Sequence, residues 1–251
     1  MAVGAETKFI VLMTGRSGSV WVMSTLNNIP GVTAHGALFL PRSRAEGTRW
    51  DSDFAHTRFI ETKSKGFNYR PFSVFSYLND LYSTPGSVGF KLNYAQFGYY
   101  PELLAYLIWH RINVIHLVRK NQLDILISYK VKAKLGKAHL LSGQSSPDDL
   151  QITLDTDNLV QRLSWLQKKQ RLGNLFLNLC GLRNMEIAYE DLLRDENNFN
   201  KIFDFLGLNS EEHTPEFSTN KIRKGSHREV VQNYEEVKEV LASTQFASLL
   251  D

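Results

Sequence analysis

Cysteine is almost absent from this chain of 251 residues, in which Cys180 is the only one. An intrachain disulfide is therefore impossible, and a cysteine-based metal site is not expected. Long apolar runs are missing too, because none approaches the roughly 20 residues that a membrane-spanning helix needs. Met1 to Lys8 is too short and polar for a signal peptide. We therefore expect a soluble, cytoplasmic protein that does not associate with membranes.

A strong charge of one sign is also missing, because the formal net charge is only +3. That balance argues against a dedicated nucleic-acid binder and is compatible with an anionic ligand. With 43% hydrophobic residues, the chain can bury one large α/β core. No internal repeat and no shift in charge pattern marks a boundary, which predicts a single domain over residues 1–251.

The most informative stretch of the sequence runs from Phe9 to Leu26. It begins with an unbroken apolar run up to Met13, as in a strand that is buried on both faces of a parallel sheet. The next six residues, Thr14 to Ser19, contain two glycines, three hydroxyls and one arginine. Apolar residues then recur at helical spacing. The pattern predicts a strand, a tight loop and the start of a helix.

Such a loop is suited to a phosphate group. Backbone N–H groups and the positive end of the helix dipole meet there, and Gly15 and Gly18 let the backbone approach closely. The hydroxyls and the fork of the Arg16 guanidinium add directed donors. The alternative is an ordinary strand-to-helix turn with serine as the N-cap. The loop is not of the nucleoside-triphosphate kind, because no Gly-Lys-Ser/Thr sequence closes it.

Three further apolar stretches are typical of strands in the same sheet, at residues 32–36, 88–94 and 113–118. His35 lies near the carboxyl end of the first, where ligands of open α/β sheets bind, so we expect it close to the loop. Lys91 lies within the second, where a buried charge needs an anionic partner. The alternatives are a histidine with local hydrogen bonds and a lysine that snorkels to solvent.

Arg119 directly follows the third stretch, and Ser128 lies nine positions later in the helix that should come next. These two side chains could converge on one anion. Residues 137–153 include a Ser-Gly-Gln-Ser-Ser-Pro-Asp-Asp sequence and indicate a loop, which is either a solvated linker or a lid. Residues 157–173 predict an amphipathic helix.

These stretches together resemble the sulfotransferases that use 3′-phosphoadenosine 5′-phosphosulfate (PAPS). In that superfamily the first strand-loop-helix holds the 5′-phosphosulfate, and an arginine and a downstream serine after the central strand hold the 3′-phosphate. Arg119 and Ser128 look like the second pair, one position further apart than in the cytosolic branch. The first motif is similar to eight consecutive residues here: Thr14, Gly15, Arg16, Ser17, Gly18, Ser19, Val20 and Trp21.

The resemblance extends over about residues 8–235. Tyr189, in a Tyr-Glu-Asp sequence, is similar to the family's tyrosine beside the nucleotide, and Trp21 to the tryptophan that stacks on adenine. Arg223, Lys224 and Gly225 resemble the segment that closes over the 3′-phosphate in cytosolic members. The implied fold is α/β and P-loop-like, with a parallel central sheet flanked by helices.

The resemblance also implies a mechanism that needs no metal ion. Arg16 and the loop N–H groups would meet the negative charge that grows on the departing adenosine 3′,5′-bisphosphate (PAP). Lys91 resembles the strand lysine that approaches the sulfuryl group. The cytosolic branch takes its base two positions after that lysine, where this chain has Asn93, which cannot serve. Other branches take the base from the segment after the first helix, so we nominate His35. The rivals are His56, Asp51, Asp53 and Glu61.

The sequence thus predicts a sulfotransferase that moves a sulfuryl group from PAPS to a hydroxyl or an amine. The acceptor is expected to be a small molecule, with a natural product and a carbohydrate both left open. Two alternatives remain, a protein that binds PAP or PAPS without catalysis and a phosphotransferase of the nucleotide-kinase type. The sequence indicates no oligomeric state.

Overall fold

The computed structural model describes residues 6–40, 56–62, 69–135, 150–208 and 226–250. The chain divides into two compact units, one formed by Met1–Val118 with Gly173–Phe217 and the other by Arg119–Leu172 with Ser218–Asp251. Apolar side chains cluster separately within each unit. The prediction of a single domain is not tested by this division and stays a prediction.

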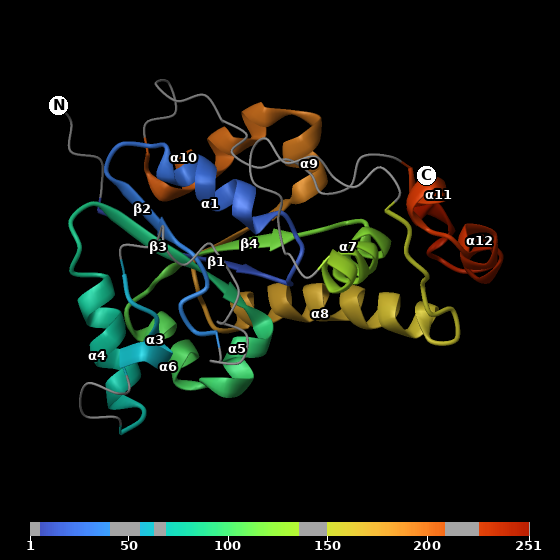
Figure 1. Cartoon of the computed structure of the whole chain (residues 1–251). Helices are drawn as coiled ribbons and strands as arrows, with labels where there is room; N and C mark the ends of the chain where they lie inside the picture. Colours follow the sequence, from blue (N-terminus) through green and yellow to red (C-terminus); the bar gives the residue numbers. More distant parts are fainter. Residues whose placement is uncertain (1–5, 41–55, 63–68, 136–149, 209–225, 251) are drawn as a thin grey trace. The chain divides into compact units, whose positions relative to one another are not determined.

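The first unit contains a sheet of five parallel strands in the order β2-β3-β1-β4-β5. The strand bounds are Lys8–Met13 for β1, Val32–His35 for β2, Ser87–Asn93 for β3, Asn113–Val118 for β4 and Asn184–Ala188 for β5. β1 lies in the middle and is buried from Phe9 to Met13, as its apolar run predicts. The parallel sheet, with helices against it, confirms the predicted fold class (Figure 1).

Helices cover both faces of this sheet (Figure 1). Against one face, which carries Val11 and Met13 of β1, pack the helices α1 (Ser19–Asn27), α9 (Tyr189–Arg194) and α10 (Phe199–Leu206). Against the other, which carries Ile10 and Leu12, pack α4 (Phe72–Leu81), α6 (Glu102–Trp109) and the end of α8 (Leu159–Leu179). The short elements α3 (Phe59–Thr62), α5 (Tyr94–Tyr99) and η2 (Glu196–Asn198) also belong to this unit.

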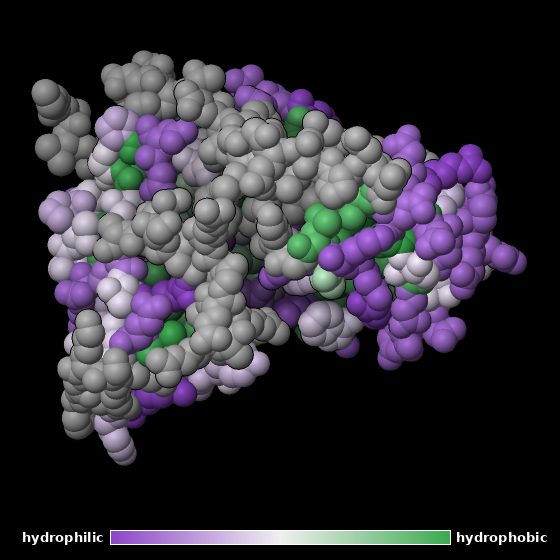
Figure 2. All heavy atoms as spheres, viewed as in Figure 1, coloured by the Kyte–Doolittle hydropathy of each residue, from purple (hydrophilic) through white to green (hydrophobic). Residues whose placement is uncertain are grey.

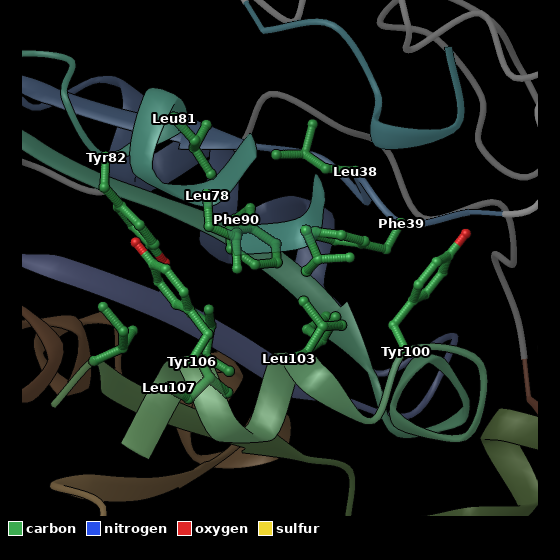
Figure 3. Close-up of a cluster of buried hydrophobic side chains, with 14 of the residues drawn as sticks. Leu38, Phe39, Leu78, Leu81, Tyr82, Phe90, Tyr100, Leu103, Tyr106 and Leu107 are labelled. Atoms are coloured by element: carbon green, nitrogen blue, oxygen red, sulfur yellow. The ribbon is translucent and has the colours of Figure 1, made fainter. Parts of the chain in front are cut away.

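The core beneath the second face is rich in aromatic rings (Figure 3). The ring of Phe39, after β2, lies 5.7 Å from that of Phe90 in β3 and 5.4 Å from that of Tyr100. Leu78 of α4 and Leu103 of α6 close the cluster. This packing holds the chain after β2 against Phe90 of β3 and Tyr100.

The described part of the second unit is mainly helical. It contains α7 (Gln122–Leu135), the first part of α8, α11 (His227–Val230), α12 (Tyr234–Ala242) and the 3₁₀ turn η3 (Ala247–Leu249). Its apolar cluster includes Leu123, Leu163 and Leu241. Figure 2 shows that the outer surface over α11 and α12 is mostly hydrophilic. In the described ranges, no helix is both long and apolar enough to cross a membrane.

The helix predicted over residues 157–173 continues to Leu179, so Gly173 lies inside α8 and does not end it. A glycine within a helix costs about 1 kcal/mol relative to alanine. Beyond it, Leu177 is fully buried against the sheet, and this burial offsets the cost and extends the helix.

Candidate functional site

The loop between β1 and α1 has an unusual backbone. Arg16 has a φ of 69° and Gly18 a φ of 84°, so two of its residues are left-handed. Left-handed residues in such a loop turn successive N–H groups toward one side and form an anion-binding concavity. Gly18 is also the N-cap of α1, and it has no side chain with which to cap the helix. This contradicts the alternative of a serine-capped turn and leaves the helix N-terminus to an external acceptor.

The hydroxyls of the loop do not all act in the same way. Ser17 is fully buried and donates its hydroxyl proton to the Thr14 carbonyl oxygen at 2.9 Å, which braces the loop from inside. The expectation that every loop hydroxyl is a donor for a ligand is therefore wrong for Ser17. Thr14 Oγ1 is buried, and no hydrogen-bond partner for it exists among the described residues. A buried polar atom of this kind fits a site that an anionic group completes.

Tyr189, the first residue of α9, packs directly on the loop. A Cβ placed on Gly18 would lie 2.2 Å from Cδ2 of the Tyr189 ring, so only glycine fits there. The structure therefore brings Tyr189 and the loop together. Trp21 makes edge contacts with Tyr189 and Phe199, at centroid distances of 6.0 and 5.0 Å, and is 5% exposed. A base could stack on this indole only after the ring became more exposed.

His35 does not lie beside the loop. It pairs with Phe90 of β3, which pairs with Ile10 of β1, so β2 ends level with the middle of β1. Ile10 lies four residues before Thr14, roughly 13 Å along the strand, and two strand spacings add about 10 Å sideways. The expected proximity of His35 and the loop is therefore wrong, because β2 is an edge strand that ends early. The catalytic role of His35 stays a prediction.

Lys91 and His35 lie on opposite faces of the sheet. His35 shares the face of its partner Phe90, and consecutive residues of a strand alternate between faces. Lys91 pairs with Val11 of β1, so its half-buried side chain lies on the face that α1 covers. This is the face on which the loop continues into α1. The structure thus places these two predicted catalytic residues on opposite faces and leaves Lys91 on the side of α1.

His35 belongs instead to the aromatic core after β2. Its side chain is buried, and its ring lies 5.9 Å from that of His56, which contacts Tyr77 edge-on at 5.0 Å. Burial, and then the nearby His56, lowers the pKa of His35 from 6.5 to about 4. Burial also lowers the pKa of His56, although Asp80 opposes the change. His35 is therefore neutral near pH 7 and is a weak proton acceptor.

We expect acid to destabilise the fold through His35. Between pH 6.5 and about 4 the unfolded chain binds a proton at this site that the folded chain does not, so stability is full above that window and falls through it. The loss amounts to about 3 kcal/mol of unfolding free energy. His35→Leu removes this titration, and urea unfolding at a series of pH values should show a shallower acid slope. Equal slopes in both proteins would contradict the assignment.

In the second unit, the chain around Arg119 is held firmly. The Arg119 guanidinium donates to Asp124 Oδ2 at 2.7 Å. The Arg119 carbonyl oxygen accepts from Gln122 at 3.3 Å and from Gln170 of α8 at 3.1 Å. Asn121 accepts from the Asp124 backbone N–H at 3.1 Å and so caps α7, as an asparagine in this position should. Ser128 lies six residues into α7, roughly 9 Å from its start.

Sequence reasoning missed Asp124 and His227. The second oxygen of Asp124, Oδ1, lies 3.0 Å from Nε2 of His227, a fully buried residue at the start of α11. Asp124, in the first turn of α7, thus joins Arg119, which precedes this helix, to α11, which begins at His227. No spacing rule pairs residues so far apart, and the only sequence signal is the position of His227 two residues after Gly225.

Several predicted residues lie outside the described ranges. These are Arg223, Lys224 and Gly225, the rival bases Asp51 and Asp53, and most of the loop at residues 137–153. Of the other rivals, Glu61 is exposed and His56 neighbours His35. Within the described ranges, no group of three or more histidine, cysteine, aspartate or glutamate side chains could hold a metal ion.

No family model and no curated protein matches this sequence. Solved structures do align with it. Mouse sulfotransferase SULT7A1, complexed with PAP, aligns at 15% identity and a TM-score of 0.46, over 82% of this chain and 60% of its own. A sulfotransferase from Alicyclobacillus acidocaldarius aligns at 13% identity and a TM-score of 0.46, over 86% of this chain and 87% of its own. A sulfotransferase domain of the curacin biosynthetic pathway aligns at 14% identity and a TM-score of 0.43, over 98% of this chain and 83% of its own.

All three are sulfotransferases. The chain spans only 60% of the length of the mouse protein's chain. At identities and TM-scores this low, the likeness assigns no role to any residue of this chain.

Proposed function

We propose that this chain is a sulfotransferase that transfers a sulfuryl group from PAPS to a hydroxyl or amine of a small molecule. The observation that carries the proposal is the loop after β1. It combines two left-handed residues, a helix N-terminus capped by glycine and a buried Thr14 hydroxyl with no partner in the described part of the chain. Together with the motif resemblance, this backbone supports a 5′-phosphosulfate site.

The proposed PAPS-binding residues come from four segments. They are Thr14, Gly15, Arg16, Ser17, Gly18, Ser19, Val20 and Trp21, then Arg119 and Ser128, then Tyr189, and finally Arg223, Lys224 and Gly225. Ser17 would contribute through its backbone N–H, since its hydroxyl is used within the loop. Trp21 would contribute mainly by holding Tyr189 in place.

PAPS, when bound, supplies an activated sulfuryl group whose leaving group is a phosphate. The residues of this chain then have separate tasks. Arg16 and the loop N–H groups stabilise charge on the departing phosphate, and donors placed in advance are worth about 10²–10³ in rate each. Lys91, on the face of the sheet that α1 covers, would interact with the sulfuryl oxygens. The resemblance indicates His35 as the base, but β2 ends level with Ile10 of β1, and the lowered pKa of His35 makes it a weak proton acceptor, so the proposal leaves the base to a residue nearer the loop.

One observation favours a second candidate, a PAP- or PAPS-binding protein without catalysis. Asn93, in the position of the base of the cytosolic branch, is the N-cap of α5. Its side-chain oxygen accepts from the Ala95 N–H at 3.0 Å, and its own N–H donates to Gln96 at 2.6 Å. This capping box gives Asn93 a structural task that involves no proton transfer.

The first test is a calorimetric titration with PAP, run beside ATP. We expect PAP to bind and ATP to bind more weakly. Arg119→Ala should weaken PAP binding roughly 10- to 100-fold, because a hydrogen bond to a charged group contributes about 1.5–3 kcal/mol. Arg228→Ala is the matched control, since this arginine lies in the same unit with its side chain 73% exposed. A preference for ATP, or equal affinities of the two variants, would contradict the proposal.

A further inference from the structure

Three titratable side chains form a hydrogen-bonded line across one face of the sheet in the first unit. The Tyr94 hydroxyl contacts His116 Nε2, and His116 Nδ1 lies 3.0 Å from Glu186 Oε2. Tyr94 comes directly after β3, His116 lies in β4 and Glu186 in the edge strand β5. Because β1 separates β3 from β4, the contact between Tyr94 and His116 crosses the face of β1.

This line lies close to the proposed phosphate loop. His116 pairs with Leu12 of β1, only two residues before Thr14, which is roughly 7 Å along the strand. Tyr94 follows Asn93, the partner of Met13, so its Cα comes level with the start of the loop. His35, by contrast, is the last residue of the edge strand β2 and lies level with Ile10 of β1. The line therefore reaches the carboxyl edge of the sheet, where ligands of parallel sheets bind.

The site is built to hold the tyrosine. The capping box of Asn93 and Gln96 fixes the first turn of α5, in which Tyr94 is the first residue. From the other side, Gly173 of α8 lies so close that an added Cβ would be 2.7 Å from Cε1 and 2.9 Å from the hydroxyl oxygen of Tyr94. Glycine lowers the stability of a helix relative to alanine. Here it leaves the space that the Tyr94 ring occupies.

The protonation states follow from the surroundings. Burial, and then Glu186, raises the pKa of Tyr94, so the phenol keeps its proton near neutral pH. Burial lowers the pKa of His116, although Glu186 opposes the change. Neutral His116 therefore accepts from Tyr94 at Nε2 and donates from Nδ1 to Glu186. His116 pairs with Leu12 of β1, a member of the apolar cluster on this face, and Cys180 packs against the same cluster.

We propose that Tyr94 is the catalytic residue that takes the acceptor's proton. In exchange, the Tyr94 hydroxyl passes its own proton to His116, which Glu186 supports. The inference rests on the proposed function. As the acceptor oxygen forms its bond to sulfur, its proton moves to Tyr94 Oη and the phenol proton moves to His116 Nε2. The resulting imidazolium is stabilised by Glu186, whose side chain is 43% exposed and connects the line to solvent. The bond from sulfur to the phosphate oxygen breaks, and PAP leaves with the electron pair.

The line has a purely structural alternative, in which it only satisfies buried polar groups. The two roles differ in what they predict for acceptors of different acidity. The acceptor phenol keeps its proton near neutral pH, so its transfer reaction needs a base. The acceptor p-nitrophenol ionises readily, so its transfer reaction needs no base. A structural defect would slow transfer to both acceptors equally.

The experiment measures PAPS consumption with phenol, water and p-nitrophenol as acceptors, at a pH above neutral. Tyr94→Phe keeps the ring and should slow transfer to phenol and water about 100-fold or more. Transfer to p-nitrophenol and the affinity for PAP should stay within about twofold. The control is Tyr99→Phe on the same helix, because Tyr99 is 60% exposed and the loss of its hydroxyl should leave transfer to all three acceptors unchanged.

Two further measurements test the role of Glu186, the last residue of the line. Glu186→Gln removes the carboxylate that raises the pKa of His116, so the acid limb of the rate profile with phenol should move to lower pH. Nuclear magnetic resonance of ¹⁵N-labelled imidazoles in the nucleotide-free protein should show His116 taking its proton at lower pH in the same variant. This second readout needs no turnover.

The outcomes separate the two proposals. A wild-type protein that neither binds PAP nor consumes PAPS contradicts the proposed function itself. A wild-type protein that binds PAP yet consumes no PAPS overturns the proton path and leaves the non-catalytic binding protein. If the wild type is active and Tyr94→Phe matches it with phenol, or slows both phenols equally, the proposed function stands and the proton path is overturned. An unmoved His116 titration in Glu186→Gln overturns it too.

Discussion

Arg16→Ala is expected to slow transfer from PAPS about 100- to 1,000-fold, the usual loss for a preorganised donor at a developing charge. Arg16 lies at the centre of the loop, between Gly15 and the buried Ser17. The fork of its guanidinium matches two anionic oxygens at once. The affinity for PAP should fall as well. Single-turnover PAPS consumption and PAP calorimetry measure the two effects separately.

The left-handed backbone at Arg16 provides the control for this substitution. Arg16→Gly removes the same side chain but also relieves a conformation, φ 69°, that costs an L-residue roughly 1–2 kcal/mol. If the guanidinium acts on the ligand, the alanine and glycine variants should lose the same activity, and Arg16→Lys should recover part of it. Activity that survives in the glycine variant would show that loop geometry, and not the charge, had caused the loss.

Gly18→Ala is expected to destabilise the protein by roughly 2–5 kcal/mol and to abolish PAP binding. The left-handed φ of 84° contributes about 1–2 kcal/mol of this loss for any L side chain. The added Cβ would also lie 2.2 Å from the ring of Tyr189, and overpacking of this kind costs roughly 1–3 kcal/mol. Relief of the contact moves either the loop or α9. Urea unfolding and PAP calorimetry are the measurements.

Gly31 offers a matched control, because it has a φ of 76° and nothing within 4 Å of an added Cβ. Gly31→Ala should therefore cost only the roughly 1–2 kcal/mol of backbone strain and leave PAP binding intact. The difference between the two variants measures the contact with Tyr189. Equal losses of stability would mean that Tyr189 does not press on the loop.

Local features of this fold could be predicted from the sequence. The apolar run from Phe9 to Met13, the glycines after it and the helical spacing up to Leu26 specify a strand, a loop and a helix through neighbours in the chain. The start of α7 followed similarly, because an asparagine at residue 121 caps it through contacts only three residues away. Such signals depend on short-range sterics and hydrogen bonds, which composition and spacing record.

Long-range features could not be predicted in this way. The place where β2 stops depends on its register with β3, and on the aromatic core that holds Phe39 against Phe90. His116 meets a residue 70 positions away and His227 one that is 103 positions away. The order of strands and the packing of helices bring these pairs together. A histidine within an apolar strand is the only mark that the first pair leaves in the sequence.

The glycine inside α8 has a consequence for protein engineering. Helix optimisation would replace Gly173 with alanine, for a gain of about 1 kcal/mol. Here the new methyl group would occupy the space of the Tyr94 phenol, so the gain in helix propensity would be offset by displacement of that ring. Gly98, with open space around it, is the better choice for such a change. A residue that looks like a weak point in one helix is thus a spatial requirement of its neighbour.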